Sequence, residues 1–234
     1  MNEITQIRRL SLWIFFIPLI AINLCLLISQ NYELLEGTFF TVDQLGRSLY
    51  SIPYLDGSLS ISRASRTFPQ YLIFKPAMIL TSILLIFYWK NNNNLINDLY
   101  GISNKSFNFK TFGILSAIFL IIHAILLGIK IEIQIFKLLR RVILLSFIIF
   151  EIIAQALLVY NFYKLRDRIK SLYNPFILKL KFSLVSVLIV VAILSLPLLI
   201  MKGNTHFKHG LEWNYFIGVV GFYLLTRFFW RRTT

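Results

Sequence analysis

Residues 142–163 read V-I-L-L-S-F-I-I-F-E-I-I-A-Q-A-L-L-V-Y-N-F-Y, an apolar run interrupted near its middle by Glu151 and Gln155. As a helix the run would rise about 33 Å, at 1.5 Å per residue. The hydrocarbon core of a bilayer is about 30 Å thick. The run therefore predicts a membrane-spanning helix, and it places a carboxyl group deep within the bilayer, where unpaired charge is costly.

The rest of the chain repeats this pattern. Hydrophobic residues make up 57% of the sequence and charged residues 15%, whereas soluble domains are about 45 to 50% apolar and about 25% charged. A water-soluble domain is thereby excluded. We expect an all-α, polytopic membrane protein, a bundle of six transmembrane helices that forms a single domain over residues 1–234. The six predicted spans are 12–29, 71–89, 111–129, 142–163, 182–201 and 212–230.

Charge predicts the orientation and the partners. Of the 24 Lys and Arg residues, 14 fall on the side of the N-terminus and 10 on the other side, which favours cytoplasmic termini and an external loop over residues 30–70. Arg140 and Arg141 oppose this bias, because they crowd a short loop placed outside. The net charge of +14 is concentrated beside the spans, where it meets lipid headgroups. We therefore expect membrane lipids as partners and no nucleic acid.

Glu151 needs a polar neighbour inside the bilayer. The short connection between the third and fourth spans predicts an antiparallel hairpin centred near residue 135 or 136, which brings position 151 opposite position 120. His123 lies within one helical turn of that position. A His123–Glu151 pair in a polar cavity is the functional interpretation; a hydrogen bond that only fixes helix packing is the alternative.

A second polar cluster is H-F-K-H-G-L-E-W, residues 206–213. If the last helix begins early enough, His209 and Glu212 share a face and act as acid and base or bind a headgroup. His206 would lie about 120° away from Glu212, a poor arrangement for three metal ligands. Gly210 favours a loop here, and in that alternative Glu212 caps the helix while the histidines are solvated. We expect no metal and no other cofactor, and the one cysteine, Cys25, excludes an intramolecular disulfide.

The third cluster closes the long loop. Ser60 and Ser62 alternate with apolar residues, and Arg63 and Arg66 follow them. Hydroxyls and guanidinium groups close to the membrane surface suit phosphate oxygens. The alternative is a basic loop that only anchors the second span.

A known family shares these residues. The pattern S-x-S, then P-Q-x-x-x-F-K, resembles the first extramembrane loop of the damage-regulated autophagy modulator family and its relatives, the post-GPI-attachment lipid-remodelling proteins and the N-terminal region of a yeast cell-wall protein. The family's glycine before the proline is replaced here by residues 65–67. The resemblance implies six spans and lipid or GPI-anchor remodelling in one branch, and regulation without catalysis in another. The matching positions are Ser60, Ser62, Pro69, Gln70, Phe74, His123 and Glu212 to Phe216.

These features together predict a multi-pass integral membrane protein that binds a lipid or glycolipid headgroup from the external or lumenal side and takes part in its remodelling. The sequence does not identify the membrane, and it leaves open enzymatic activity, a homo-oligomer and a partner membrane protein. The main alternative is a non-enzymatic scaffold or regulator. A small-solute or proton-coupled transporter that uses Glu151 is weaker, because the cytoplasmic halves of the spans read as nearly all Leu, Ile and Phe.

Overall fold

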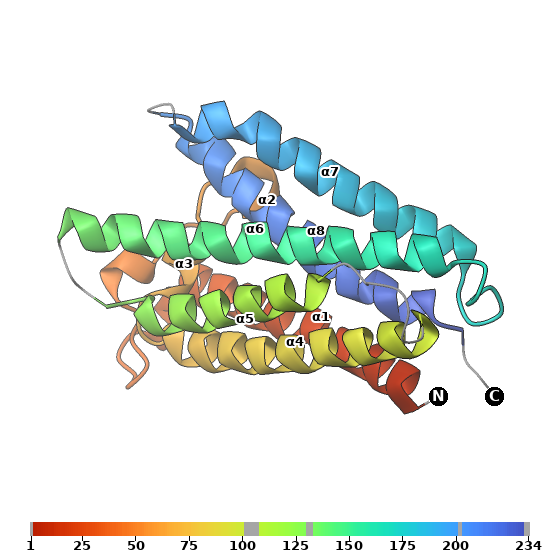
Figure 1. Cartoon of the computed structure of the whole chain (residues 1–234). Coiled ribbons are helices and arrows are strands. Elements are labelled where there is room, and N and C mark those ends of the chain that lie inside the picture. Colours follow the sequence, from red (N-terminus) through yellow and green to blue (C-terminus); the bar gives the residue numbers. More distant parts are fainter. Residues whose placement is uncertain (1, 101–107, 130–132, 201–202, 232–234) are drawn as a thin grey trace.

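The computed structural model describes residues 2–100, 108–129, 133–200 and 203–231, and within these ranges the chain is helical, with no strand beyond an isolated bridge between Tyr173 and Trp230. Both chain termini lie at one end of the bundle (Figure 1), here named the terminus end; the opposite end, which carries residues 31–70, is the loop end. The long helices are α1 (Asn2–Gln30), α4 (Tyr71–Tyr100), α5 (Phe109–Leu126), α6 (Gln134–Leu165), α7 (Pro175–Ile200) and α8 (Thr205–Phe229).

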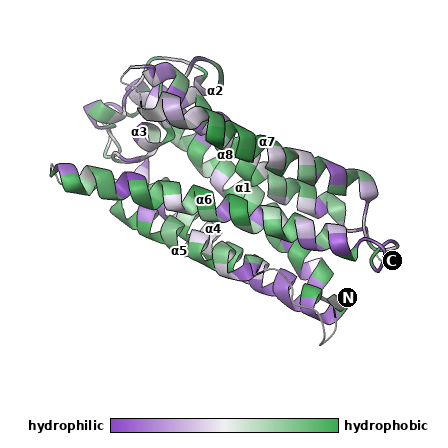
Figure 2. Cartoon of the chain, turned by 45° about the horizontal axis from the view of Figure 1, so that its top comes forward, coloured by the Kyte–Doolittle hydropathy of each residue, from purple (hydrophilic) through white to green (hydrophobic). Residues whose placement is uncertain are grey.

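Five of these helices, α1 and α4 to α7, are long and apolar enough to cross a membrane, counted over the described residues. The sixth predicted span coincides with α8, which is long enough but carries His206, Lys208, His209 and Glu212 in its first two turns. In Figure 2 the apolar colour follows the long helices, and polar residues gather toward the two ends of the bundle. The predicted all-α class is confirmed, and the apolar helices indicate a multi-pass integral membrane protein.

The helices extend beyond the apolar runs. Helix α6 begins at Gln134, eight residues before the predicted span, and α8 begins at Thr205, seven residues before its span. Hydropathy marks only the part of a helix that matches the hydrocarbon core, whereas backbone hydrogen bonding continues through the flanking polar residues. The loop expected around Gly210 is therefore wrong, because Gly210 is helical. The end of the predicted span 182–201 lies outside the described residues.

Helix α7 is the least enclosed of the five apolar helices. In its apolar window 22% of the residues are buried, against 39% in each of the other four. It is attached mainly to α8: the Tyr215 hydroxyl donates to the Leu188 carbonyl over 2.7 Å, and a Cβ at Gly218 would lie 2.7 Å from the Leu188 side chain. Figure 1 shows α6 and α7 close together at the terminus end and diverging toward the loop end.

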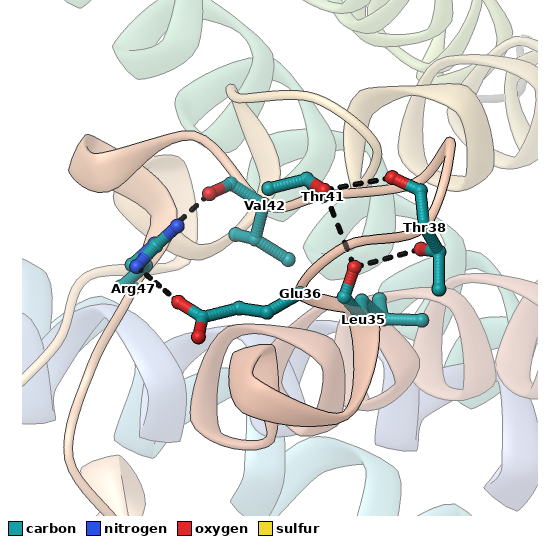
Figure 3. Close-up of polar contacts among 6 residues, drawn as sticks. All are labelled: Leu35, Glu36, Thr38, Thr41, Val42 and Arg47. Atoms are coloured by element: carbon teal, nitrogen blue, oxygen red, sulfur yellow. Dashed lines mark hydrogen bonds and ion pairs between the residues drawn. The ribbon is translucent and has the colours of Figure 1, made fainter.

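The long loop is folded against the loop end. It contains two 3₁₀ turns, η1 (Tyr32–Leu35) and η2 (Gln44–Gly46), and the short helices α2 (Pro53–Asp56) and α3 (Ile61–Ser65). Figure 3 shows part of its internal bonding: Arg47 donates to the Glu36 carboxylate at 2.7 Å and to the Val42 carbonyl at 3.0 Å. The loop thus has a defined shape that fixes the position of α3.

Gly57 brings the loop onto α8. Its φ of 60° is left-handed, and a Cβ there would overlap with the His206 carbonyl, so glycine is required on both counts. About two turns further along α8, the Trp213 indole N–H donates to the Leu59 carbonyl over 2.7 Å. Helix α3 follows directly, and it is thereby held beside the first turns of α8.

Candidate functional site

A cavity of about 720 Å³ lies at the loop end, and its walls come from all six long helices and from the α3 segment. Most of the lining is apolar. Seven of the nine predicted site residues nevertheless contribute to it, although they come from four different parts of the fold, the α3 segment, α5, α6 and α8. These seven are Ser60, Ser62, Arg66, His123, Glu151, His209 and Glu212.

Helix α3 connects two polar groups along the cavity. Ser60 caps its first turn by accepting a 3.1 Å hydrogen bond from the Arg63 amide. The adjoining amides of Ile61 and Ser62 donate to the Glu212 carboxylate. Glu212 therefore caps α3 and not α8, which begins seven residues earlier, and the alternative that it caps its own helix is wrong. Arg66 follows the other end of α3, about 7.5 Å away for five helical residues.

His209 is held by the backbone of the loop. Its Nδ1 lies 3.1 Å from the Gly57 carbonyl oxygen; a carbonyl can only accept, so Nδ1 carries the proton and Nε2 of the neutral ring is a free base. Burial lowers the pKa of His209, and the charges of His206 and Arg63 lower it further, against the Gly57 hydrogen bond. His209 and Glu212 lie on one wall of the cavity, as the early helix start predicts, without a hydrogen bond to each other.

The other polar group is an arginine cluster, consisting of Arg66, Arg140 and Arg141. Burial lowers the pKa of Arg66, and the neighbouring charges of Arg140 and Arg63 lower it further. Within the described residues, the ion pairs are Arg47–Glu36 and Arg166–Asp167, and neither includes a member of the cluster. Among the described residues, like charges are thus gathered at the cavity without an ion pair to either of its carboxyl residues, Glu151 and Glu212.

Sequence reasoning missed Arg140 and Arg141 because they were assigned to a loop. The structure puts both in α6 and on the cavity wall. One signal was visible in the sequence: basic residues are concentrated in a short loop that the predicted orientation places outside, against the positive-inside rule. Such an exception indicates that the charges serve something other than orientation.

Glu151 is completely buried on the cavity wall, where it joins three helices. It accepts hydrogen bonds from Ser116 of α5 at 2.6 Å, from Gln155 of α6 at 3.1 Å and from the Tyr223 hydroxyl of α8. The expected pair with His123 does not form. Position 151 faces position 116 and not 120, because the hairpin is centred near residue 133 or 134.

His123 is left with a buried, unpartnered Nδ1. Its side chain is only 8% exposed and belongs to the cavity lining. A buried ring nitrogen without a partner costs free energy. His123 is therefore available to a group that enters the cavity.

The two remaining predicted residues lie outside the cavity lining. Gln70 is completely buried, beside Gly46 and Thr67 of the folded loop. Arg63 is exposed, and its Nε donates to the Leu45 carbonyl at 3.4 Å. Both residues contribute contacts that hold the loop.

The terminus half of the bundle also buries polar groups, contrary to the reading of these segments as nearly all apolar. Lys181 is completely buried in α7, although it directly precedes the predicted span 182–201. Its Nζ donates to Thr226 at 2.8 Å and lies 3.9 Å from the centre of the Phe222 ring. Asn92 and Asn161 are buried in the same half.

Among the residues that the structure describes, no three His, Cys, Asp or Glu side chains form a group that could hold a metal ion. No family model, curated protein or solved structure matches this chain.

Proposed function

We propose that this membrane protein binds the phosphate-bearing headgroup of a lipid or glycolipid in the cavity and takes part in remodelling that lipid. The observation that carries the proposal is the arginine cluster in the lining of a mostly apolar cavity. Guanidinium groups bind phosphate oxygens through paired hydrogen bonds. A bound phosphate would also remove the repulsion between Arg66 and Arg140, while the apolar walls accommodate an acyl chain.

The family resemblance supports the same proposal. Seven of the positions that carry it line this one cavity: Ser60, Ser62, Phe74, His123, Glu212, Tyr215 and Phe216. Remodelling of a lipid requires proton transfer at a hydroxyl or ester group. Nε2 of His209 is a base on the wall for such a transfer, with the Glu212 carboxylate beside it.

We further propose that α8 is a sixth span, that both termini are cytoplasmic and that the cavity faces the external or lumenal side. Several polar side chains of α8, among them His209, Glu212 and Tyr223, line the cavity and so avoid lipid, which is where intramembrane polar groups are tolerated. Single cysteines in a Cys25→Ala background test the topology. Those at Glu33 and Thr205 are expected to react with an impermeant thiol reagent from outside, and those at Asn94 and Ser171 are not. The opposite labelling pattern overturns the orientation.

Lipid retention tests the headgroup site. Native mass spectrometry of the purified protein with phosphatidylglycerol or phosphatidylcholine added measures the lipid that stays bound. Arg66→Gln and Arg140→Gln are expected to lower retention of the anionic lipid, whereas Lys179→Gln, an exposed cation on α7 near the terminus end, provides the matched control. Unchanged phosphatidylglycerol retention in both arginine variants rejects the proposal and favours the scaffold alternative.

A further inference from the structure

The cavity is open sideways, toward the surroundings of the bundle. Leu145 and Ile149 of α6 line it and are still 48% and 53% exposed. These two side chains therefore lie both inside the cavity and on the outer face of the molecule. Figures 1 and 2 show α6 separating from α7 and α8 in this half of the bundle.

The α7 side of the opening carries small residues. Ala192 and Ser195 line the cavity from this helix. The Ser195 hydroxyl donates back to the Ala192 carbonyl at 3.0 Å, so its polar group is satisfied within its own helix. Their neighbours Ile193 and Leu194 are strongly exposed on the outer face. The opening thus has an apolar surround that matches the interior of a bilayer.

The loop end, by contrast, is covered. Helix α3 lies over the cavity with Ile61 and Ala64 buried beneath it. The Trp213–Leu59 bond and the Glu212 contacts to the α3 amides fasten this cover to α8. A molecule that arrived from the water above would have to break these bonds, whereas one that arrived through the side would not.

We propose that the ligand is a lipid of the surrounding leaflet, which enters and leaves through the side opening between α6 and α7. This proposal rests on the proposed headgroup site. The anionic headgroup passes beneath α3 to the arginine cluster, and Arg141, which is exposed on α6, marks the depth at which the headgroup enters. The acyl chain remains between Leu145, Ile149 and Ala192. A soluble phosphate compound would not enter by this route, because the opening faces the apolar interior of the bilayer.

Filling the opening tests the route. Ala192→Trp narrows it, and Val190→Trp, at a residue of α7 that is 52% exposed and outside the cavity lining, provides the matched control. Two probes are compared on each variant: retention of phosphatidylglycerol by native mass spectrometry, and binding of water-soluble glycerol phosphate by calorimetry. We expect Ala192→Trp to lower lipid retention about tenfold while glycerol phosphate binding is unchanged. Val190→Trp changes neither, and Arg66→Gln weakens both.

A label attached after folding covers the case in which Ala192→Trp does not fold. Leu145→Cys in a Cys25→Ala background, carrying a bulky thiol reagent, is expected to lower lipid retention; Leu139→Cys with the same label, at an exposed α6 residue outside the lining, is not.

The outcomes separate the two proposals. Equal lipid retention in Ala192→Trp and Val190→Trp, and in both labelled proteins, rejects the side route, while a loss in Arg66→Gln still supports the headgroup site. No loss in either Arg66→Gln or Arg140→Gln rejects the headgroup site itself. If the unsubstituted protein binds glycerol phosphate but does not retain the lipid, the ligand is a soluble phosphate compound, and that also overturns the route.

Discussion

The Ser116 hydroxyl donates a 2.6 Å hydrogen bond to a carboxylate oxygen of Glu151, and this bond joins α5 to α6 inside the bundle. Tyr223 of α8 donates to the other carboxylate oxygen. Three helices that line the cavity are therefore connected at one buried side chain. The shape of the cavity depends on these bonds as much as on the apolar packing around them.

Glu151→Leu is expected to destabilise the protein strongly. The change leaves the Tyr223 hydroxyl and the Gln155 amide without their bonds to the carboxylate, at about 1 to 3 kcal/mol for an unsatisfied buried group, whereas the Ser116 hydroxyl can still donate to the Gly113 carbonyl 2.8 Å away. Glu151→Gln keeps an acceptor oxygen and a similar size, and this variant should lose much less stability than Glu151→Leu. Thermal unfolding in detergent measures both changes, and a Glu151→Leu variant as stable as the parent would contradict the assigned network.

Coupling between positions tests the helix register. In a double-mutant cycle, Ser116→Val and Glu151→Leu should be non-additive, because both changes remove the same hydrogen bond. His123→Leu and Glu151→Leu should be additive within about 0.5 kcal/mol, since no hydrogen bond connects the pair. The opposite result would restore the pairing predicted from the sequence and would argue for a register one turn different.

Substitutions at Lys181 and Thr226 should change the stability of the protein in different ways. Thr226→Val removes the hydroxyl that accepts the Lys181 hydrogen bond and should cost about 1 to 3 kcal/mol, because the buried amino group of Lys181 loses its partner. Lys181→Met replaces this buried polar side chain by an apolar chain of similar length among aromatic rings, and the change should be neutral or stabilising. Thermal unfolding of both variants is the measurement, and a larger loss in Lys181→Met than in Thr226→Val would contradict it.

Substitutions at Glu212 test whether its carboxylate takes part in catalysis or only caps α3. Glu212→Gln keeps an acceptor for the α3 amides but loses charge and proton transfer, so the protein should stay folded and lose activity in complementation of a cell that lacks it. Glu212→Ala removes the cap of α3 as well, with a further loss of about 0.5 to 2 kcal/mol of stability. Full complementation by a stable Glu212→Gln variant would reject a catalytic role and leave the cap as the residue's function.

His209 should make stability depend on pH. Its folded pKa lies below the ordinary value of 6.5 because the ring is partly buried. The unfolded chain therefore binds the proton more readily, and stability falls as pH drops below 6.5 toward the lowered pKa. The contribution is fully present above pH 6.5. His209→Gln should reduce this pH dependence in thermal unfolding measured between pH 5 and 7.5, and an unchanged profile in the variant would assign the dependence to another group.

The sequence by itself determined that the protein is all-α and built from membrane-length helices. An apolar run of about twenty residues, such as 142–163, has the length of a membrane-spanning helix. In lipid the backbone N–H and C=O groups of such a segment must be hydrogen-bonded within it, and a helix does this. It also identified seven polar residues that line the cavity. Glu151 was identifiable because a carboxyl group in an apolar run is costly and needs an internal partner.

Only the tertiary structure decided which residues meet. The choice of Ser116 and not His123 as the partner of Glu151 depends on where the α5–α6 hairpin is centred, and hydropathy does not fix a register to within one turn. Likewise, Glu212 caps α3 because Gly57 lets the loop approach α8. Arg140 joins Arg66 because α6 begins before its apolar run. Contacts between distant segments follow from packing and helix ends, neither of which a local pattern of residues encodes.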